Sequence, residues 1–147
     1  MQGIMTFIRE YRYLMVPFGV WFGIQLFKLL YDIVKEKRFN FKRIMQAGGM
    51  PSSHSAVVVV LTIMIAKAEG LTSPVFGVSL IFSFIVMYDV AGVRRAAGKQ
   101  AKLLNKIVET PGLSGVEVSE RLVEVLGHTP VQVIVGALIG LVVGLII

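Results

Sequence analysis

Four long apolar segments constrain this chain more strongly than any other feature of its sequence. They cover about residues 14–34, 53–68, 73–90 and 130–147. A hydrocarbon core of ~30 Å needs ~20 helical residues, with ~17 as a lower limit. The first and third segments meet this length easily, whereas the second and fourth are short. We therefore expect an all-α membrane protein with about four transmembrane helices, and three spans plus a re-entrant segment are the main alternative.

The composition agrees with this class and excludes several others. Hydrophobic residues make up 55% of the 147 residues and charged residues only 16%, which is more apolar than a typical soluble domain. The chain has no cysteine, so a disulfide framework and a thiolate metal site are excluded. We expect a single integral membrane domain over residues 1–147. The net charge of +6 is explained by basic cytoplasmic loops, and we expect no nucleic-acid partner.

The basic residues between the segments predict an orientation. Lysine and arginine are concentrated in the link between the first two segments and in the link between the last two. The short turn "AKAEGLTSP" has only Lys67, offset by Glu69. By the positive-inside rule both basic links face the cytoplasm, and both termini face outward. We expect a multi-pass protein of the cell membrane, with Arg9 and Arg12 weakly opposing this orientation.

The link after the third segment has the pattern of two amphipathic cytoplasmic helices. In "VRRAAGKQAKLLNKIV", basic residues recur at helical spacing and form one stripe. In "SGVEVSERLVEVLG", Ser114 and Glu117 have the spacing of a capping box, and apolar residues follow on one face. The basic stripe is either a solvated or headgroup-facing surface, or part of a binding site. Its members are Arg95, Lys99, Lys102 and Lys106.

Three glycines recur every four residues in the last segment, at Gly136, Gly140 and Gly144. Small residues at this interval let two helices approach closely in a membrane. We favour packing against another helix of the same chain as the interpretation. The same spacing also permits a homodimer, so that partner is kept open.

The four-span topology brings the unusual polar residues to one membrane face. His54 begins the second segment in "GGMPSSHSAVVVV", and His128 directly precedes the fourth in "LGHTPVQVIVGALIG". Lys28 and Asp89 lie near the ends of the first and third segments. Because ionisable residues at such positions are rare and costly, the cluster indicates a functional site. We therefore expect the two histidines to meet.

The expected site has the chemistry of an anion-binding site. The start of a helix presents unpaired N–H groups and positive partial charge, and phosphate is the ligand that commonly binds there. Ser52 or Ser53 can cap the second segment, and Thr129 can cap the fourth. A neutral imidazole can act as nucleophile and a protonated one as general acid. The candidates to neutralise phosphoryl oxygens are Lys28, Arg94, Arg95 and Lys99.

Structural interpretations of the same residues remain open at this point. A histidine at a helix end is often only an interfacial residue. Lys28 and Asp32 are four residues apart and can form an ion pair with each other. Asp89 can pair with Arg94 or Arg95 to set the turn, or it can orient a histidine. No sharp ligand spacing indicates a metal, so we expect neither a metal nor another cofactor.

Three motifs together resemble a known family. "GGMPSSHSA", "MYDVAGVRRAAGKQAKLLN" and "LGHTPVQVIVGALIG", in that order, resemble the divergent branch of the type-2 phosphatidic acid phosphatase superfamily, which is related to acid phosphatases and vanadium-dependent haloperoxidases. The resemblance implies metal-free phosphate-ester hydrolysis through a phosphohistidine. By it, His128 resembles the attacking histidine, His54 the general acid and Ser52 a phosphate-holding serine. Lys28 is the candidate for the lysine of the first superfamily signature.

The sequence also departs from the superfamily signatures. Ser53 stands where the second signature has glycine, and no Arg-Pro pair follows Lys28. No Ser-Arg pair precedes His128 at the expected distance. Gln132 stands where an aspartate normally supports the attacking histidine, and that support stabilises the imidazolium formed during attack.

We infer from position alone that Asp89 can replace the missing acid, and that Arg94 or Arg95 can replace the missing arginine. The expected function is hydrolysis of a phosphomonoester or pyrophosphate on a membrane lipid, at a site facing the cytoplasm. The alternative is a non-catalytic membrane protein that binds phosphate or a phospholipid headgroup and has lost turnover. A structural or channel-like bundle is a third class.

Overall fold

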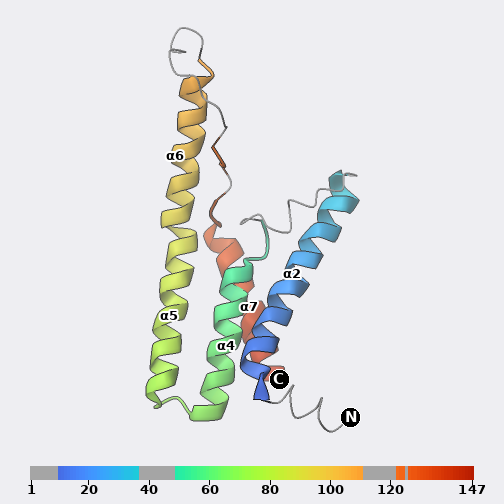
Figure 1. Cartoon of the computed structure of the whole chain (residues 1–147), viewed down its shortest axis with the longest axis vertical. Coiled ribbons are helices and arrows are strands. Elements are labelled where there is room, and N and C mark those ends of the chain that lie inside the picture. Colours follow the sequence, from blue (N-terminus) through green and yellow to red (C-terminus); the bar gives the residue numbers. More distant parts are fainter. Residues whose placement is uncertain (1–9, 37–48, 111–121, 125) are drawn as a thin grey trace.

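The computed structural model describes residues 10–36, 49–110, 122–124 and 126–147, and these residues form helices and connecting loops with no strand. The expected all-α fold is confirmed. The helices are α2 (Arg12–Glu36), α4 (Ser53–Glu69), α5 (Pro74–Ala91), α6 (Val93–Val108) and α7 (Pro130–Ile146). Figure 1 shows α4, α5 and α7 side by side, α2 crossing them at an angle, and α6 extending beyond them.

Short polar residues fix where the apolar helices begin. The Ser73 side chain accepts a hydrogen bond from the Phe76 N–H at 3.1 Å, and Pro74 occupies the first turn of α5. Thr129 caps α7 in the same way, with Pro130 behind it. These are the residue types that satisfy the unpaired N–H groups of a first helical turn. At the C-terminal end of α4, Gly70 has φ 82°, a conformation that glycine adopts without strain.

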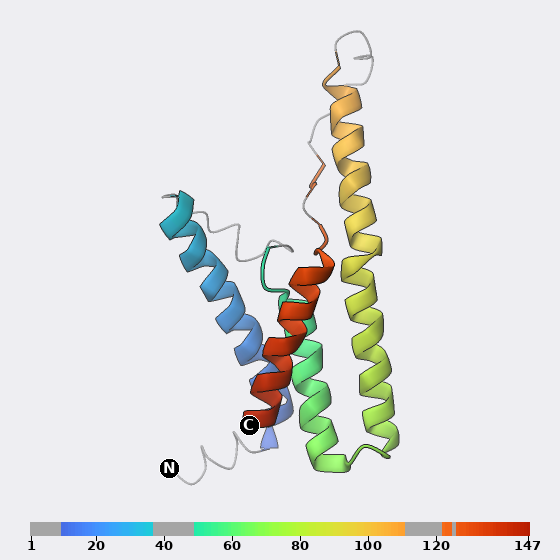
Figure 2. The ribbon, with the colours of Figure 1, turned by 180° about the vertical axis from the view of Figure 1, so that it is seen from behind.

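The helices alternate in direction, and this places the polar residues together. Figures 1 and 2 show α2 and α5 running one way while α4 and α7 run the other. The ends of α2 and α5 therefore lie toward the same side of the bundle as the starts of α4 and α7. The expectation that the chain brings these four helix ends to one side of the bundle is confirmed.

α4 is the central helix, and α2, α5 and α7 each pack against it. Its buried positions include Ala56, Val60 and Met64, which follow one another at four-residue intervals. Residues with this spacing share one face of a helix. The apolar residues of α5 point mostly away from this core, where Ile81, Phe84 and other large side chains are exposed.

α4 and α7 lie parallel and in close contact because α7 presents glycine to α4. A Cβ atom on Gly136 would overlap the Ser52 carbonyl oxygen, and one on Gly140 would overlap that of Ala56. A Cβ on Gly144 would lie 2.7 Å from the Cβ of Ile63. The interpretation that these glycines pack within one chain is confirmed.

Polar contacts hold the two ends of this helix pair. At the start, the Ser52 N–H donates to the Gln132 carbonyl at 3.1 Å. At the far end, the Lys67 ammonium donates to the Leu145 carbonyl at 3.1 Å. A lysine is favourable there, because the last carbonyls of a helix carry negative partial charge.

A second polar contact joins α4 to α5 in the middle of the bundle. Thr62 Oγ1 lies 2.8 Å from Ser83 Oγ, and the Ser83 hydroxyl donates to the Val58 carbonyl at 3.1 Å. All three groups are buried. Hydrogen bonds of this kind hold helices together in an apolar medium, each contributing about 0.6–2 kcal/mol.

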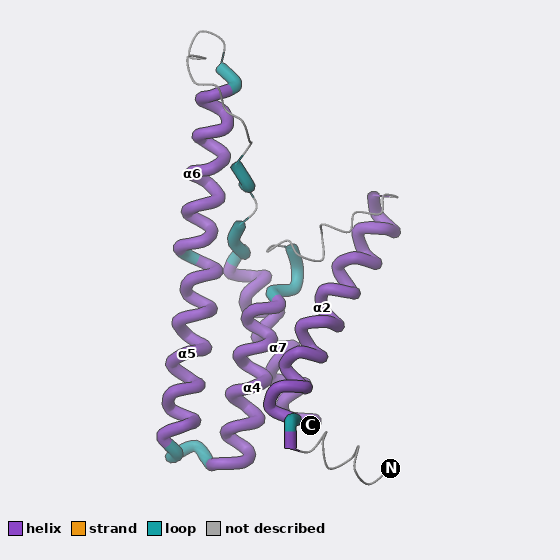
Figure 3. The backbone as a smooth tube through the Cα atoms, in the orientation of Figure 1, coloured by secondary structure: helices purple, strands orange, loops and turns teal. Residues whose placement is uncertain are grey.

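α6 continues the direction of α5 beyond the bundle, as Figures 1 and 3 show. Gly92 separates the two helices and donates its N–H to the Tyr88 carbonyl at 2.8 Å.

Two stretches of the described residues are long and apolar enough to cross a membrane, Arg12–Lys35 and the combined Pro74–Val108, and Pro130–Ile146 is a shorter apolar helix.

The second amphipathic helix expected after α6 is wrong in the part that the structure describes. Residues 122–124 and 126 are not helical. Instead the Asn105 side chain donates to the Leu122 carbonyl at 2.9 Å and accepts from the Leu122 N–H at 3.0 Å, which holds this non-helical segment against α6. The capping box at Ser114 and Glu117 lies outside the described residues, as does the basic link at residues 37–43.

We predict that Gly140→Ala lowers stability. Its methyl group would overlap the Ala56 carbonyl, and overpacking of this kind costs about 1–3 kcal/mol. The control is Gly77→Ala on α5, where a Cβ meets no atom within 4 Å and helix propensity improves. Thermal unfolding in detergent should show a lower midpoint for Gly140→Ala only, and equal midpoints would contradict the close α4–α7 contact.

Candidate active site

The two histidines meet where α4 and α7 begin. The centroids of the His54 and His128 rings lie 6.0 Å apart, with the ring planes at 75°. His54 is in the first turn of α4, and His128 directly precedes the Thr129 cap of α7. The expectation that the two histidines come together is confirmed, although they are far apart in the sequence.

The position of His128 is fixed from both sides along the chain. Its backbone N–H donates to the Val90 carbonyl at 2.9 Å, which ties it to the end of α5. On the other side, Thr129 and Gln132 form a capping box at the start of α7. The Thr129 N–H donates to Gln132 Oε1 at 2.9 Å. The backbone at His128 is thus held by two helix ends.

The ring nitrogens of His128 have no hydrogen-bond partner among the described residues, although the residue is only 1% exposed. The Nδ1 atom of His54 is buried in the same unpartnered state. Leaving a buried polar group unsatisfied costs about 1–3 kcal/mol, so native structures rarely retain one without a reason. The parallel starts of α4 and α7 add N–H groups that have no intrahelical acceptor. Together these observations indicate a site for an anionic ligand.

Burial is the main cause that lowers the pKa of His128 from its usual 6.5 to about 4, and the nearby charges of Lys28, His54 and Arg94 contribute to the same shift. The imidazole is therefore neutral at pH 7. A neutral imidazole has a free lone pair on one nitrogen, as a nucleophile requires.

The serines before His54 serve mainly to start α4. Ser52 Oγ accepts hydrogen bonds from the Ser55 N–H at 3.4 Å and from the Ser55 hydroxyl at 3.0 Å. Since the Ser52 N–H is bound to Gln132, only the hydroxyl proton of Ser52 is left to offer a ligand. Ser53 is already helical and buried, so a glycine is not needed for the backbone at this position.

Two cations act on both imidazoles, Lys28 from α2 and Arg94 from the start of α6. Lys28 is buried, with 8% of its surface exposed. The Arg94 guanidinium lies 2.7 Å from the Asp89 carboxylate, and both side chains are partly exposed. Asp89 is thus paired with Arg94 and not hydrogen-bonded to the unpartnered ring nitrogens. Its charge also acts on His54.

Unlike Lys28 and Arg94, Arg95 and Lys99 are not placed beside the histidines. Both are exposed along α6, and neither is among the charges that act on the two imidazoles. The backbone of Arg95 lies against Gly127, where a Cβ would overlap it. The expected role of these two residues in substrate binding remains a prediction.

Gln132 has a structural role that the sequence interpretation missed. Its side chain completes the capping box of α7, and its carbonyl accepts from Ser52. The spacing of Thr129 and Gln132 is that of a capping box, so this role could have been found in the sequence. The Gln132 side chain, which stands where the superfamily has an aspartate, is therefore hydrogen-bonded to the Thr129 backbone. It is not hydrogen-bonded to the His128 ring.

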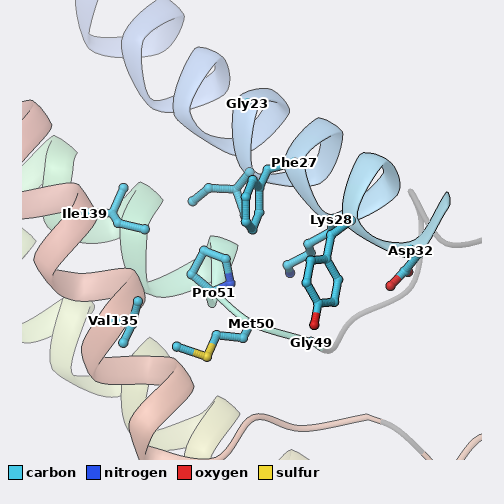
Figure 4. A pocket seen from close by; sticks show the side chains of 11 residues that line it. Gly23, Phe27, Lys28, Asp32, Gly49, Met50, Pro51, Val135 and Ile139 are labelled. Carbon is cyan, nitrogen blue, oxygen red and sulfur yellow. The ribbon is translucent and has the colours of Figure 1, made fainter. Parts of the chain in front are cut away.

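A cavity of about 610 Å³ lies beside this cluster, between α2, α7 and the loop before α4. Figure 4 shows Phe27 and Lys28 of α2 on one side, Val135 and Ile139 of α7 on the other, and Pro51 between them. The walls are mostly apolar, and Lys28 and Asp32 are at one end. No sequence pattern indicated this cavity. Among the described residues, no three His, Cys, Asp or Glu side chains are placed to hold a metal ion.

Comparison with known proteins places the chain in a family. The model of the Divergent PAP2 family matches residues 10–143. The chain is similar to the "Uncharacterized membrane protein YuiD" of Bacillus subtilis (strain 168), with 37% identity over 134 residues that cover 84% of this chain and 85% of the relative. No solved structure matches. With the paired histidines and the apolar helices, these matches show that the chain is a membrane protein belonging to the Divergent PAP2 family.

Proposed function

We propose that this protein is a membrane phosphatase that hydrolyses a phosphomonoester or pyrophosphate on a lipid through a phosphohistidine. The observation that carries the proposal is the pair of imidazoles 6.0 Å apart, with both His128 nitrogens unpartnered. Membership of a phosphatase-related family supports it. The cations Lys28 and Arg94 beside the rings suit a phosphoryl group.

In the first step a ring nitrogen of His128 attacks phosphorus, and the bond to the leaving oxygen breaks. Protonated His54 donates its proton to that oxygen, so the alcohol or phosphate leaves without a new negative charge on the oxygen. In the second step neutral His54 takes a proton from water, and the hydroxide attacks phosphohistidine. Inorganic phosphate leaves, and both histidines return to their starting states.

The cations and the helix starts supply the electrostatic part of catalysis. Lys28 and Arg94 neutralise the phosphoryl oxygens, while Asp89 holds the Arg94 guanidinium in place. The N–H groups at the starts of α4 and α7 add positive partial charge. Arg95 and Lys99 on exposed α6 attract anionic headgroups toward the site.

The proposal includes four membrane crossings, by α2, α4, α5 and α7. α4 and α7 have 17 residues each, at the lower limit for a span. The site then faces the cytoplasm of a cell membrane, at the level of the lipid headgroups. A lipid substrate can keep its tail in the bilayer while its phosphate enters the site.

One observation favours a second candidate, a protein that binds lipid phosphate without turnover. Gln132 is committed to the α7 cap, and no carboxylate in the described part of the chain is hydrogen-bonded to the His128 ring. The imidazolium that forms during attack therefore lacks the support that an acid provides. A phosphoenzyme distinguishes the two candidates, because only the enzyme forms one.

We predict that the purified protein forms a histidine phosphoenzyme and that His128→Gln abolishes it. His54→Gln should still form phosphoenzyme from an aryl phosphate, whose leaving group needs no proton, but should lose at least about 100-fold in turnover of alkyl lipid phosphates. Acid-quenched labelling with each variant measures both effects. Gly77→Ala is the control for folding. Saturable binding of lipid phosphate without any phosphoenzyme would favour the second candidate.

We also predict an unusual pH dependence. Because the His128 pKa is lowered to about 4, the nucleophile stays neutral as pH falls through 6.5 and is lost only near pH 4. The kcat/KM of His54→Gln on an aryl phosphate should therefore keep its value between pH 7 and pH 5. The imidazole NMR signals of the ligand-free protein check this directly, and a His128 titration near pH 6.5 would contradict the buried position of the ring.

A further inference from the structure

We propose that the cavity between α2 and α7 binds the hydrocarbon tail of the lipid phosphate, and that the lipid enters the site sideways between these helices. The cavity volume of about 610 Å³ is within the range of protein ligand sites. This inference rests on the proposed function for the head of the ligand. It adds a separate site for the tail.

The cavity lies where two helices of the bundle are not packed on each other. α2 and α7 both pack against α4, and the space between them is bounded by the loop at Gly49, Met50 and Pro51. Figure 4 shows this loop crossing between the two helices. If the four helices cross a membrane, such a gap opens toward lipid and not toward water.

The lining changes from polar to apolar along α2. Lys28 and Asp32 are at the end nearer the loop, whereas Gly23 lies more than one turn deeper. Opposite that deeper part, α7 contributes Val135 and Ile139. A ligand with one charged end and one hydrocarbon end matches this order, because each part meets a surface of its own kind.

Lys28 connects the cavity to the histidines. It lines the cavity, and its positive charge acts on both His54 and His128. A phosphate beside the imidazoles can thus contact the same ammonium group that borders the tail cavity. This charge favours a phosphate-headed lipid over a neutral one, and the apolar walls favour a lipid over a free phosphate.

Gly23 offers a direct test of the cavity. It lines the cavity, and a Cβ built on it meets no atom within 4 Å. A large side chain there fills the space without displacing the packed helices. Gly19 is the matched control, since it lies one turn earlier on the same helix, also meets no atom within 4 Å, and does not line the cavity.

The experiment compares wild type, Gly23→Leu and Gly19→Leu on two substrates, a long-chain lysophosphatidate and glycerol phosphate. Gly23→Leu should lower kcat/KM for the long-chain substrate at least about tenfold, because tail binding is lost. Turnover of glycerol phosphate should change less than about twofold, because the histidines and cations are intact. Gly19→Leu should leave both unchanged.

Equal effects of Gly23→Leu on both substrates, or no effect on either, would overturn the tail site while leaving the phosphatase proposal standing. If wild type hydrolyses neither substrate, binding decides the tail site. Native mass spectrometry should then show lysophosphatidate bound to wild type and Gly19→Leu but not to Gly23→Leu. Equal occupancy in all three, or equal binding of monoacylglycerol and lysophosphatidate, would refute the inference.

Discussion

The close parallel contact of α4 and α7 is the constraint on which the rest of the structure depends. Glycines on α7 lie against the backbone of α4, and polar contacts from Ser52 and Lys67 hold the two ends of the pair. Parallel helices present their N-terminal ends side by side, so their partial positive charges add at one place. The proposed anion site therefore follows from how these two helices pack, before any side-chain chemistry is considered.

The side chains then give this place its chemical character. Both histidines sit at the paired helix starts, and burial keeps the pKa of His128 low, near 4. Lys28 reaches the site from α2 and Arg94 from the start of α6. Residues of α2, α4 and α6 and the residue before α7 thus form one cluster, because helices that alternate in direction return to the same side of the bundle.

Much of this arrangement could be predicted from the sequence. The lengths of the apolar segments predicted the helices, and the positions of His54 and His128 at the starts of such segments predicted that the two residues meet. The cavity could not be predicted, because it arises where α2 and α7 fail to touch, which no local pattern records. The helix predicted around Leu122 is wrong because the local periodicity is helical, whereas hydrogen bonds with Asn105 hold the segment against α6 in a non-helical conformation. Tertiary contacts here outweigh local preference.

The hydrogen bond from His128 to the Val90 carbonyl has a mechanical consequence. It attaches one imidazole to the end of α5, while the other belongs to α4. The spacing of the two rings therefore depends on the angle between α4 and α5 as well as on the α4–α7 contact, and the buried Thr62–Ser83 contact restrains that angle. A small change in this angle would move the His54 and His128 rings apart without moving either residue within its own segment.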